Sequence, residues 1–281
     1  MIVEGFAKVN LSLRVRPRDT SGYHPIRSLV QSIGWADRVT LGFAHDEDGF
    51  TVDGDLPAEE DNLAWRAVNA VRRDAGSRRP VLLHLEKRIA VAAGLGGGSA
   101  DAAAGLVAAS RLLQSAPEAA TRLAPELGSD VAFCLVGGTA WMEGRGEVVT
   151  GVPIETDYAV AVMVPPFELS TAEVYRRWDE MDGPAGVGVE GRSLPPSLRE
   201  YAPFANDLVP AALDLNPHLG EWKKDLGRAW GRPALLSGSG PAVFGFFSDE
   251  EEANAAIAVV EGARGLWAGV PVSFGTRLVE S

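Results

Sequence analysis

The sequence predicts an α+β fold built from two domains, and three observations point to it. Residues 2–15 alternate between apolar and polar side chains, which is typical of a strand. A strand at residues 81–85 is followed by a glycine-rich loop and an alanine-rich helix. From residue 158 onward the elements follow the order β-α-(α)-β-β-α-β, a layered α+β pattern. We expect residues 1–153 to form the first domain and residues 154–281 the second.

In the first half, the alternation predicts a half-buried strand with Lys8 and Asn10 on one face, opposite Val9 and Leu11. Turn-rich residues follow this strand. The remaining elements expected here are strands at residues 37–43, 49–52, 81–85, 139–142 and 147–150, and helices at 62–75, 100–113, 121–127 and 130–135.

In the second half, the helix at residues 172–181 has Ser170 and Thr171 as candidate caps. Residues 182–200 are rich in glycine and proline, so we expect an exposed loop. The other expected elements are strands at 158–164, 234–236, 242–247 and 270–278, and helices at 206–230, with an interruption at Asn216-Pro217, and at 250–263.

Composition and charge exclude several classes of protein. The net charge of −12 repels polyanions, so no nucleic-acid partner is expected, and an anionic substrate must be held by local donors. No apolar run reaches the roughly 18 residues of a membrane helix, and the first residues lack a signal-peptide core. Cys134 is the single cysteine and lies in an apolar run, which predicts a buried side chain. We therefore expect a cytoplasmic protein without a membrane partner, either a monomer or a weak homodimer.

The strongest local motif is Gly94-Leu95-Gly96-Gly97-Gly98-Ser99, which opens a helix. Glycine lets a ligand approach the backbone, and the amide groups of a first helical turn attract phosphate. No Gly-Lys-Ser or Gly-Lys-Thr follows, so this is not a Walker loop, and Ser99 stands where a dinucleotide fingerprint has glycine. A purely structural turn remains an alternative, but four glycines in five positions favour an anion site.

Other candidates have ordinary structural explanations when each is taken alone. Ser237-Gly238-Ser239-Gly240 joins two strands as a hairpin does, or closes a site as a second glycine loop. Asp130 could cap a helix, and Lys8 could extend along a strand edge into solvent. Tyr23-His24 could be turn residues.

Taken together, these segments resemble one enzyme superfamily. Ala7-Lys8-Val9-Asn10-Leu11, Gly22-Tyr23-His24, residues 94–103 and residues 235–240 are similar to the galactokinase, homoserine kinase, mevalonate kinase and phosphomevalonate kinase (GHMP) superfamily. The first two segments resemble the branch that phosphorylates the 2-hydroxyl of 4-diphosphocytidyl-2-C-methyl-D-erythritol with ATP, in the non-mevalonate route to isoprenoid precursors. The resemblance implies a ribosomal-protein-S5-like domain and a ferredoxin-like domain, with the site in the cleft between them.

The resemblance also implies residue roles. Asp130 would be the general base, and Lys8 would steer Asp130 and the transferring phosphoryl group. Asn10 would lie beside the methylerythritol end. Tyr23, Tyr175 and His24 would hold the cytosine, the two tyrosines by stacking and His24 at the base edge. The ATP phosphates would be cradled by Ala93, Gly94, Leu95, Gly96, Gly97, Gly98 and Ser99.

One residue departs from the family pattern, and the ligands of the metal ion are not evident from the sequence. Ala90 stands where the family usually has a proline before the glycine loop, which removes a restriction on the approach to the loop. ATP is expected with Mg²⁺, but no acidic ligand is evident. Ser99 is the candidate metal contact, beside ATP oxygens and water.

Three other functions compete with this interpretation. Another kinase of the superfamily would act on mevalonate-like or homoserine-like acceptors, whereas Gly22-Tyr23-His24 and Tyr175 favour a cytidine group. A non-catalytic nucleotide sensor would be expected to lose Lys8 or Asp130, and both are present. A dinucleotide-dependent oxidoreductase rests on the glycine loop alone.

Overall fold

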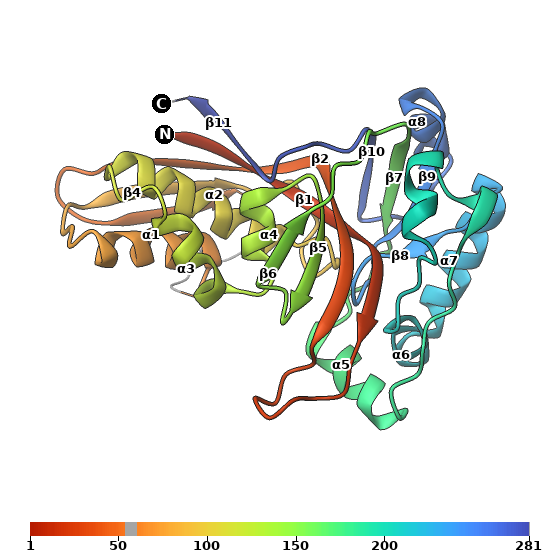
Figure 1. The fold of residues 1–281 in the computed structure, drawn as a ribbon. Helices are drawn as coiled ribbons and strands as arrows, with labels where there is room; N and C mark the ends of the chain where they lie inside the picture. Colours follow the sequence, from red (N-terminus) through yellow and green to blue (C-terminus); the bar gives the residue numbers. More distant parts are fainter. Residues whose placement is uncertain (54–60, 281) are drawn as a thin grey trace.

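Two β-sheets, each with its own helices, organise the chain into two lobes (Figure 1). The computed structural model describes residues 1–53 and 61–280. The first lobe contains the N-terminal sheet, and the second contains a sheet formed after residue 158. The long strands β1 (Ile2–Val15) and β2 (Ile26–Phe43) extend from the first lobe toward the second (Figure 1). They pair antiparallel, so the turn between them lies at the far end of this ribbon.

Within residues 1–53 and 61–280, the first sheet has seven strands and is covered by four helices. Its main path runs β11-β1-β2-β4-β3, and β5 pairs with both β2 and β6. Small alanine side chains dominate the buried face of α2, which lets this helix pack closely on the sheet. The further elements of this lobe are β3 (Gly49–Asp53), α1 (Leu63–Asp74), β4 (Val81–Glu86), α2 (Gly97–Leu112), α3 (Ala119–Leu127), α4 (Val131–Val136), β5 (Thr139–Gly144), β6 (Val148–Gly151) and β11 (Thr276–Glu280).

In the part of the chain that the structure describes, the second sheet has four strands in the order β10-β7-β9-β8. All residues of β7 and β9 are buried, because both central strands are packed on both faces. The elements of this lobe are β7 (Ala159–Val164), α5 (Thr171–Glu180), the 3₁₀ helices η1 (Gly191–Ser193) and η2 (Pro196–Tyr201), α6 (Val209–Leu215), α7 (Pro217–Trp230), β8 (Leu235–Leu236), β9 (Val243–Phe247), α8 (Glu250–Ala258) and β10 (Gly265–Gly269).

Most predicted elements are confirmed, and their ends have local causes. Asn62 caps α1 by accepting a hydrogen bond from the amide of Ala64, and Ser170 caps α5 in the same way. The helix expected at 206–230 is interrupted at Asn216-Pro217 as predicted. The loop expected at 182–200 contains the two short 3₁₀ helices.

Three expectations about strands were wrong. β1 is not half-buried: the glycine loop and the Ser237–Gly240 turn cover its polar face, so Lys8 and Asn10 are buried as well. β2 begins at Ile26 rather than at residue 37. The last strand of the second sheet is β10, and the strand expected at 270–278 is the shorter β11, which pairs with β1 in the first sheet. The helix expected at 250–263 ends at Ala258.

Candidate active site

A cleft of about 820 Å³ opens between the two lobes. It is lined by the polar face of β1, the β1–β2 turn, the start of α2, the segment before α4, the start of α5 and the β8–β9 turn. Every residue that the sequence singled out for the site lines this cleft: Lys8, Asn10, Tyr23, His24, residues 93–99, Asp130 and Tyr175.

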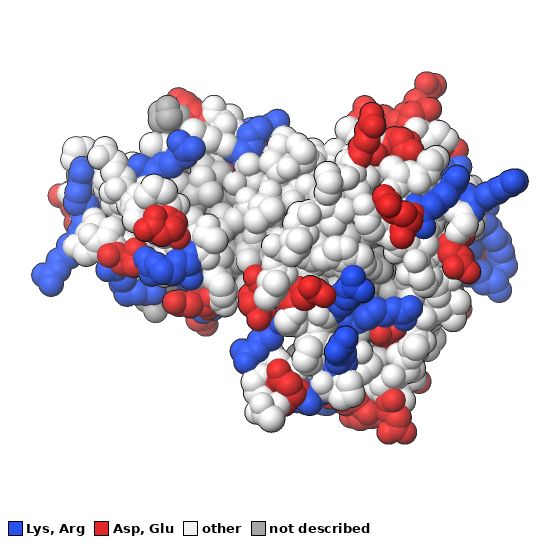
Figure 2. Space-filling view, in the orientation of Figure 1, with Lys and Arg blue, Asp and Glu red and all other residues white. Residues whose placement is uncertain are grey.

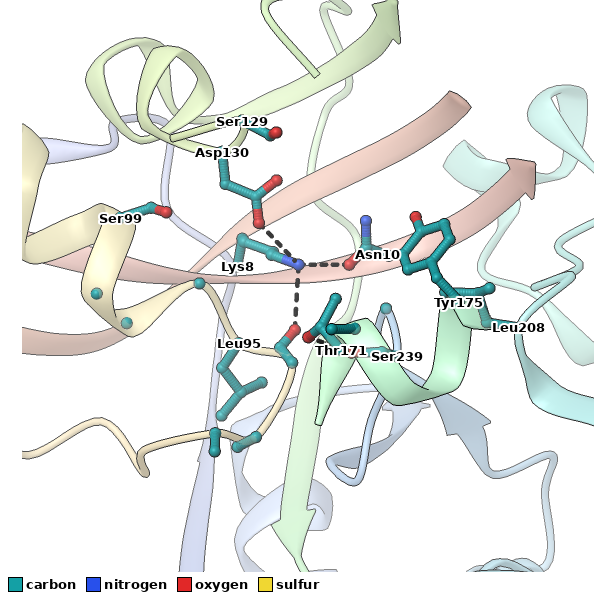
Figure 3. A pocket seen from close by; sticks show the side chains of 18 of the residues that line it. Lys8, Asn10, Leu95, Ser99, Ser129, Asp130, Thr171, Tyr175, Leu208 and Ser239 are labelled. Carbon is teal, nitrogen blue, oxygen red and sulfur yellow. Dashed lines mark hydrogen bonds and ion pairs between the residues drawn. The ribbon is translucent and has the colours of Figure 1, made fainter. Parts of the chain in front are cut away.

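The centre of the cleft is the amine of Lys8 (Figure 3). Its Nζ lies 3.3 Å from Oδ2 of Asp130, and it donates to Oδ1 of Asn10 at 2.5 Å and to the carbonyl of Gly94 at 3.1 Å. The side chain of Lys8 is only 5% exposed. Burial makes a charged amine costly unless it is paired and hydrogen-bonded, and these three partners meet that requirement.

Asp130 has a conformation that leaves its carboxylate available. It occupies the N-cap position of α4, but its side chain makes no capping hydrogen bond. Instead the carboxylate points toward Lys8, and the side chain is 28% exposed to the cleft. Helix capping therefore does not explain this residue.

Asn10 links the central lysine to both lobes. Its amide nitrogen Nδ2 donates to Ser28 Oγ at 2.8 Å, and its backbone amide donates to Ser237 Oγ at 3.2 Å. Ser237 in turn donates to the carbonyl of Gly94 at 2.9 Å. These bonds fix the orientation of Asn10, with its oxygen toward Lys8, through buried neighbours.

The glycine loop has the backbone geometry of an anion cradle. Gly94 and Gly96 have φ angles of 76° and 70°, which side chains with a Cβ rarely adopt. At Gly94 a Cβ would also lie 2.4 Å from the carbonyl oxygen of Ser237, so the two glycine loops touch. Gly96 caps α2 without a side-chain hydrogen bond, which leaves the first-turn amides free to bind a phosphate.

At the other end of the cleft, aromatic side chains gather around the β1–β2 turn. The rings of His24 and Tyr175 stack at 5.3 Å, and Nδ1 of His24 lies 2.9 Å from the carbonyl oxygen of Arg16. Tyr23 is 56% exposed, and its ring is covered by the guanidinium of Arg145. Burial, and then the charge of Asp130, raise the pKa of the Tyr175 hydroxyl, which therefore stays protonated.

A buried charge cluster at the start of α2 was not predicted from the sequence. Lys87 is ion-paired with Asp37 and with Asp101, whose Oδ2 lies 2.8 Å from the amine. Burial raises the pKa of Asp101 well above its usual value, Lys87 opposes this, and the charge of Asp37 adds to it. No sequence signal joins these residues, because they come from β2, from the segment after β4 and from α2.

Further cleft residues were also missed. Thr171 at the start of α5 lies 2.8 Å, between hydroxyl oxygens, from Ser239 in the β8–β9 turn. Both residues face the Lys8 centre from the second lobe (Figure 3). Arg18, Asn62, Leu63, Ser129 and Arg145 line the cleft as well.

A divalent metal ion in the cleft would need oxygen donors from the protein or from a bound phosphate. Within residues 1–53 and 61–280, no group of three or more histidine, cysteine or acidic side chains is arranged to hold a metal. Ser99, in the first turn of α2, offers a hydroxyl on the same side of the cleft as Asp130 (Figure 3). Such hard oxygen donors suit Mg²⁺, which keeps several waters and binds through phosphate oxygens.

Comparison with known families finds two matches along the chain. The GHMP kinases N terminal domain matches residues 62–138, and the GHMP kinases C terminal domain matches residues 194–264. The first match contains the glycine loop and Asp130, and the second contains the β8–β9 turn.

Curated relatives are similar over most of their length. A protein of Desulfitobacterium hafniense named 4-diphosphocytidyl-2-C-methyl-D-erythritol kinase is 38% identical over 90% of this chain and 89% of its own length. A protein of Corynebacterium efficiens with the same name is 40% identical, over 89% of this chain and 85% of its own length.

Comparison with solved structures also finds kinases of similar fold. A crystal structure of 4-(cytidine 5'-diphospho)-2C-methyl-D-erythritol kinase superposes with a TM-score of 0.79 at 32% identity, covering 96% of this chain and 99% of the other. A homoserine kinase from Cytophaga hutchinsonii superposes with a TM-score of 0.72 at 18% identity, covering 99% and 96%. The second likeness shows a common fold alone.

Proposed function

The chain belongs to the GHMP kinase family and, within it, to the 4-diphosphocytidyl-2-C-methyl-D-erythritol kinases, and from this premise we propose how its cleft works. The enzyme transfers the γ-phosphoryl group of ATP to the 2-hydroxyl of 4-diphosphocytidyl-2-C-methyl-D-erythritol. This reaction belongs to the non-mevalonate route to isoprenoid precursors. The observation that carries our allocation of roles is the 3.3 Å pair of Lys8 and Asp130 beside the glycine loop.

Asp130 acts as the general base for the acceptor hydroxyl. Its carboxylate is partly exposed and makes no capping bond, so one oxygen is available to a substrate proton. A positioned base of this kind supplies about 10²–10⁴ in rate. Lys8 orients the carboxylate and offsets the negative charge of the transferring phosphoryl group.

Residues 93–99 hold the ATP phosphates. The free amides at the start of α2 and the positive φ angles of Gly94 and Gly96 support this role. In a chain of net charge −12, backbone donors of this kind hold a polyphosphate with few lysines. The Ser99 hydroxyl, with ATP oxygens and water, would hold Mg²⁺, and the ion would supply charge stabilisation for phosphoryl transfer.

The cytosine of the acceptor binds at the aromatic end of the cleft. In this proposal Tyr23 and Tyr175 supply ring faces and His24 contacts the base edge, although Nε2 of His24 also lies 3.3 Å from Oδ2 of Asp179. Because His24 is stacked on Tyr175, the base enters beside this pair and uses the exposed ring of Tyr23. In this arrangement Asn10 lies between the cytosine and the amine of Lys8, beside the methylerythritol end of the acceptor.

We expect a cytoplasmic enzyme that works as a monomer or weak homodimer on small molecules. None of the helices in the described ranges is long and apolar enough to cross a membrane. Figure 2 shows acidic and basic side chains mixed on the visible face rather than gathered into one basic surface, which supports the expectation of no nucleic-acid partner.

A coupled ADP-release assay tests the acceptor. The three acceptors to compare are 4-diphosphocytidyl-2-C-methyl-D-erythritol, mevalonate and homoserine. We expect kcat/KM for the cytidylyl acceptor to exceed the other two by roughly 10³-fold or more, because those lack the group that the aromatic end binds. Turnover confined to mevalonate or homoserine would overturn the assignment.

A further inference from the structure

Arg145 differs from the other cations of the cleft in its pairing. Lys8, Lys87 and Arg18 each lie within 4 Å of a carboxylate. In the part of the chain that the structure describes, the Arg145 guanidinium has no such carboxylate, although it lines the same cleft. Its charge also acts on Asp19 in the β1–β2 turn, where hydrogen bonds from Ser21 and, more weakly, the charge of Arg145 hold the pKa of Asp19 below its usual value. Within the described residues this effect is not an ion pair within 4 Å, so the guanidinium N–H groups can still donate to a ligand.

The turn that carries Arg145 is packed against the segment of the general base. Arg145 lies between β5 and β6, next to Gly146. A Cβ on Gly146 would be 2.8 Å from the carbonyl oxygen of Ser129, so the turn rests directly on the residue before Asp130. The backbone amide of Arg145 also donates to Glu147 Oε2 at 2.6 Å, which holds the turn.

From this turn the side chain reaches toward the aromatic end. The guanidinium carbon lies 4.3 Å from the ring centre of Tyr23, a cation–π contact. Arg145 thus connects the neighbourhood of Asp130, where the acceptor alcohol reacts, with Tyr23, where the base binds. In a nucleoside-diphosphate-linked alcohol, the two phosphates lie between these ends.

We propose that Arg145 determines specificity by binding the diphosphate of the acceptor. This inference rests on the proposed function. A guanidinium suits the site because its paired N–H donors match phosphate oxygens, and because it stacks on an aromatic ring while it binds. The contact of Arg145 with Tyr23 places its guanidinium at the end of the cleft proposed for the base, so in this proposal Arg145 acts on the acceptor and residues 93–99 act on ATP.

The test uses ligands that differ only in their phosphates. Inhibition constants for cytidine, CMP and CDP are measured for the wild type, Arg145→Gln and Arg145→Lys, together with KM for ATP and for the cytidylyl acceptor. We expect Arg145→Gln to weaken CDP binding and raise the acceptor KM by about 10- to 100-fold, with cytidine binding and the ATP KM within twofold. Arg145→Lys should restore part of the loss, because it keeps the charge.

Arg27→Gln is the matched control. Arg27 also stacks on an aromatic ring, with its guanidinium carbon 4.2 Å from the centre of Trp141, and pairs with Glu143, but it does not line the cleft. Its replacement should leave the whole cytidine-to-CDP series unchanged. Circular dichroism and thermal melts confirm that each variant is folded.

Several outcomes would overturn the proposal. They are an unchanged CDP constant in Arg145→Gln, an equal loss for cytidine and CDP, or a raised KM for ATP alone. Failure of the proposed function looks different. In that case the wild type would not phosphorylate the cytidylyl acceptor, whereas the CDP-over-cytidine preference and its loss in Arg145→Gln would still be measured by direct binding.

Discussion

Lys8 is surrounded by three hydrogen-bond or ion-pair acceptors, which differ in their other contacts. Asn10 is fixed by Ser28 and Ser237, and the carbonyl of Gly94 belongs to the glycine loop. Asp130 is the acceptor with an exposed side and no competing cap. The lysine therefore connects the nucleotide loop to the proposed base, so that both are positioned by one buried charge.

Asp130→Asn tests the base. The amide keeps the size of the side chain but cannot accept a proton from the acceptor hydroxyl. We expect kcat to fall by about 10²–10⁴-fold while ATP binding changes by less than threefold. Steady-state kinetics and a titration with an ATP analogue measure the two quantities. Retention of full turnover would exclude Asp130 as the base.

At this scale the sequence predicted part of the site by physical pattern. Period-two alternation alone places Lys8 and Asn10 together. The meeting of Lys8 with Asp130 came from the family resemblance, because no local pattern links residues so far apart. Asp37, Lys87 and Asp101 were missed because each looks like an ordinary charged surface residue until the fold buries them.

The segment that leads into the glycine loop is fixed by donors from the second lobe, which hydrogen-bond to its backbone carbonyl groups. Ala242 donates its amide to the carbonyl of Ala93 at 3.0 Å, and Arg264 donates to that of Ala92 at 3.2 Å. Ala92 has a φ of 49°, which is strained for a residue with a Cβ. Both donors come from the second lobe, so the phosphate-binding loop is shaped by contacts across the cleft.

Upstream of the loop, Asp37 accepts from the amides of Arg88 and Ile89 at 2.5 and 2.8 Å. These bonds restrain the approach to the loop at the place where Ala90 replaces the family's usual proline. We expect them to offset much of the lost restriction.

Arg264→Ala tests the hold on Ala92. Strain at this residue is worth about 1 kcal/mol, so loss of the donor should raise the KM for ATP by roughly 3- to 10-fold, with little change in the acceptor KM. In an Ala92→Gly background, where glycine removes the strain, Arg264→Ala should raise the KM for ATP by less than about threefold. Initial-rate kinetics with each substrate varied measure these effects.

Arg228→Ala is the control, since Arg228 pairs on the exposed face of α7. If Arg264→Ala raised the KM for ATP equally in the wild-type and Ala92→Gly backgrounds, Arg264 would not act by stabilising the strained backbone of Ala92.

The elements themselves were predictable where their pattern was local. Helix starts at Asn62 and Ser170 follow from capping chemistry. The first part of β2 was missed because buried polar residues, Ser28, Gln31 and Ser32, interrupt its apolar alternation. Ser28 and Gln31 hydrogen-bond to distant residues, which a sequence does not reveal, and these bonds make the burial of the two side chains possible.

For the whole molecule, the C-terminal strand ties the end of the chain back to its beginning. β11 pairs with β1, and both termini lie on the same side of the first lobe (Figure 1). Glu4 on β1 accepts from Arg277 on β11 at 2.6 Å and from Arg38 on β2 at 3.2 Å. Burial alone would raise the pKa of Glu4, but the two arginines outweigh it and hold that pKa below its usual value.

Glu4→Gln should therefore destabilise the protein in a pH-dependent way. A lowered folded-state pKa stabilises the protein above the unfolded-state pKa, about 4.3, and this contribution is lost as the pH falls through the folded-state value. We expect urea denaturation to show a loss of about 1–3 kcal/mol in unfolding free energy at pH 7. The difference from wild type should shrink between about pH 5 and 3.

Glu280→Gln, at an exposed site on β11, is the control and should change the unfolding free energy by less than about 0.5 kcal/mol. A Glu4→Gln difference that stayed constant over that range would contradict the ion-pair explanation.

The return of β11 to the first sheet shows the limit of sequence patterns for the whole molecule. Residues 270–278 were expected to be a strand of the second sheet because they follow a helix, and β-propensity does not say which sheet a strand joins. Pairing with β1 depends on contacts across the length of the chain. The division at residues 153 and 154 remains a prediction, with β11 lying in the sheet of the first half.

A co-crystal structure with the cytidylyl acceptor and a non-hydrolysable ATP analogue would show whether the reacting hydroxyl meets Asp130 beside the glycine loop. We expect the terminal phosphate at the amides that begin α2, and the acceptor 2-hydroxyl within about 2.6–3.2 Å of an Asp130 oxygen. An acceptor bound with that hydroxyl turned away from Asp130 and Lys8, or a triphosphate outside residues 93–99, would contradict it.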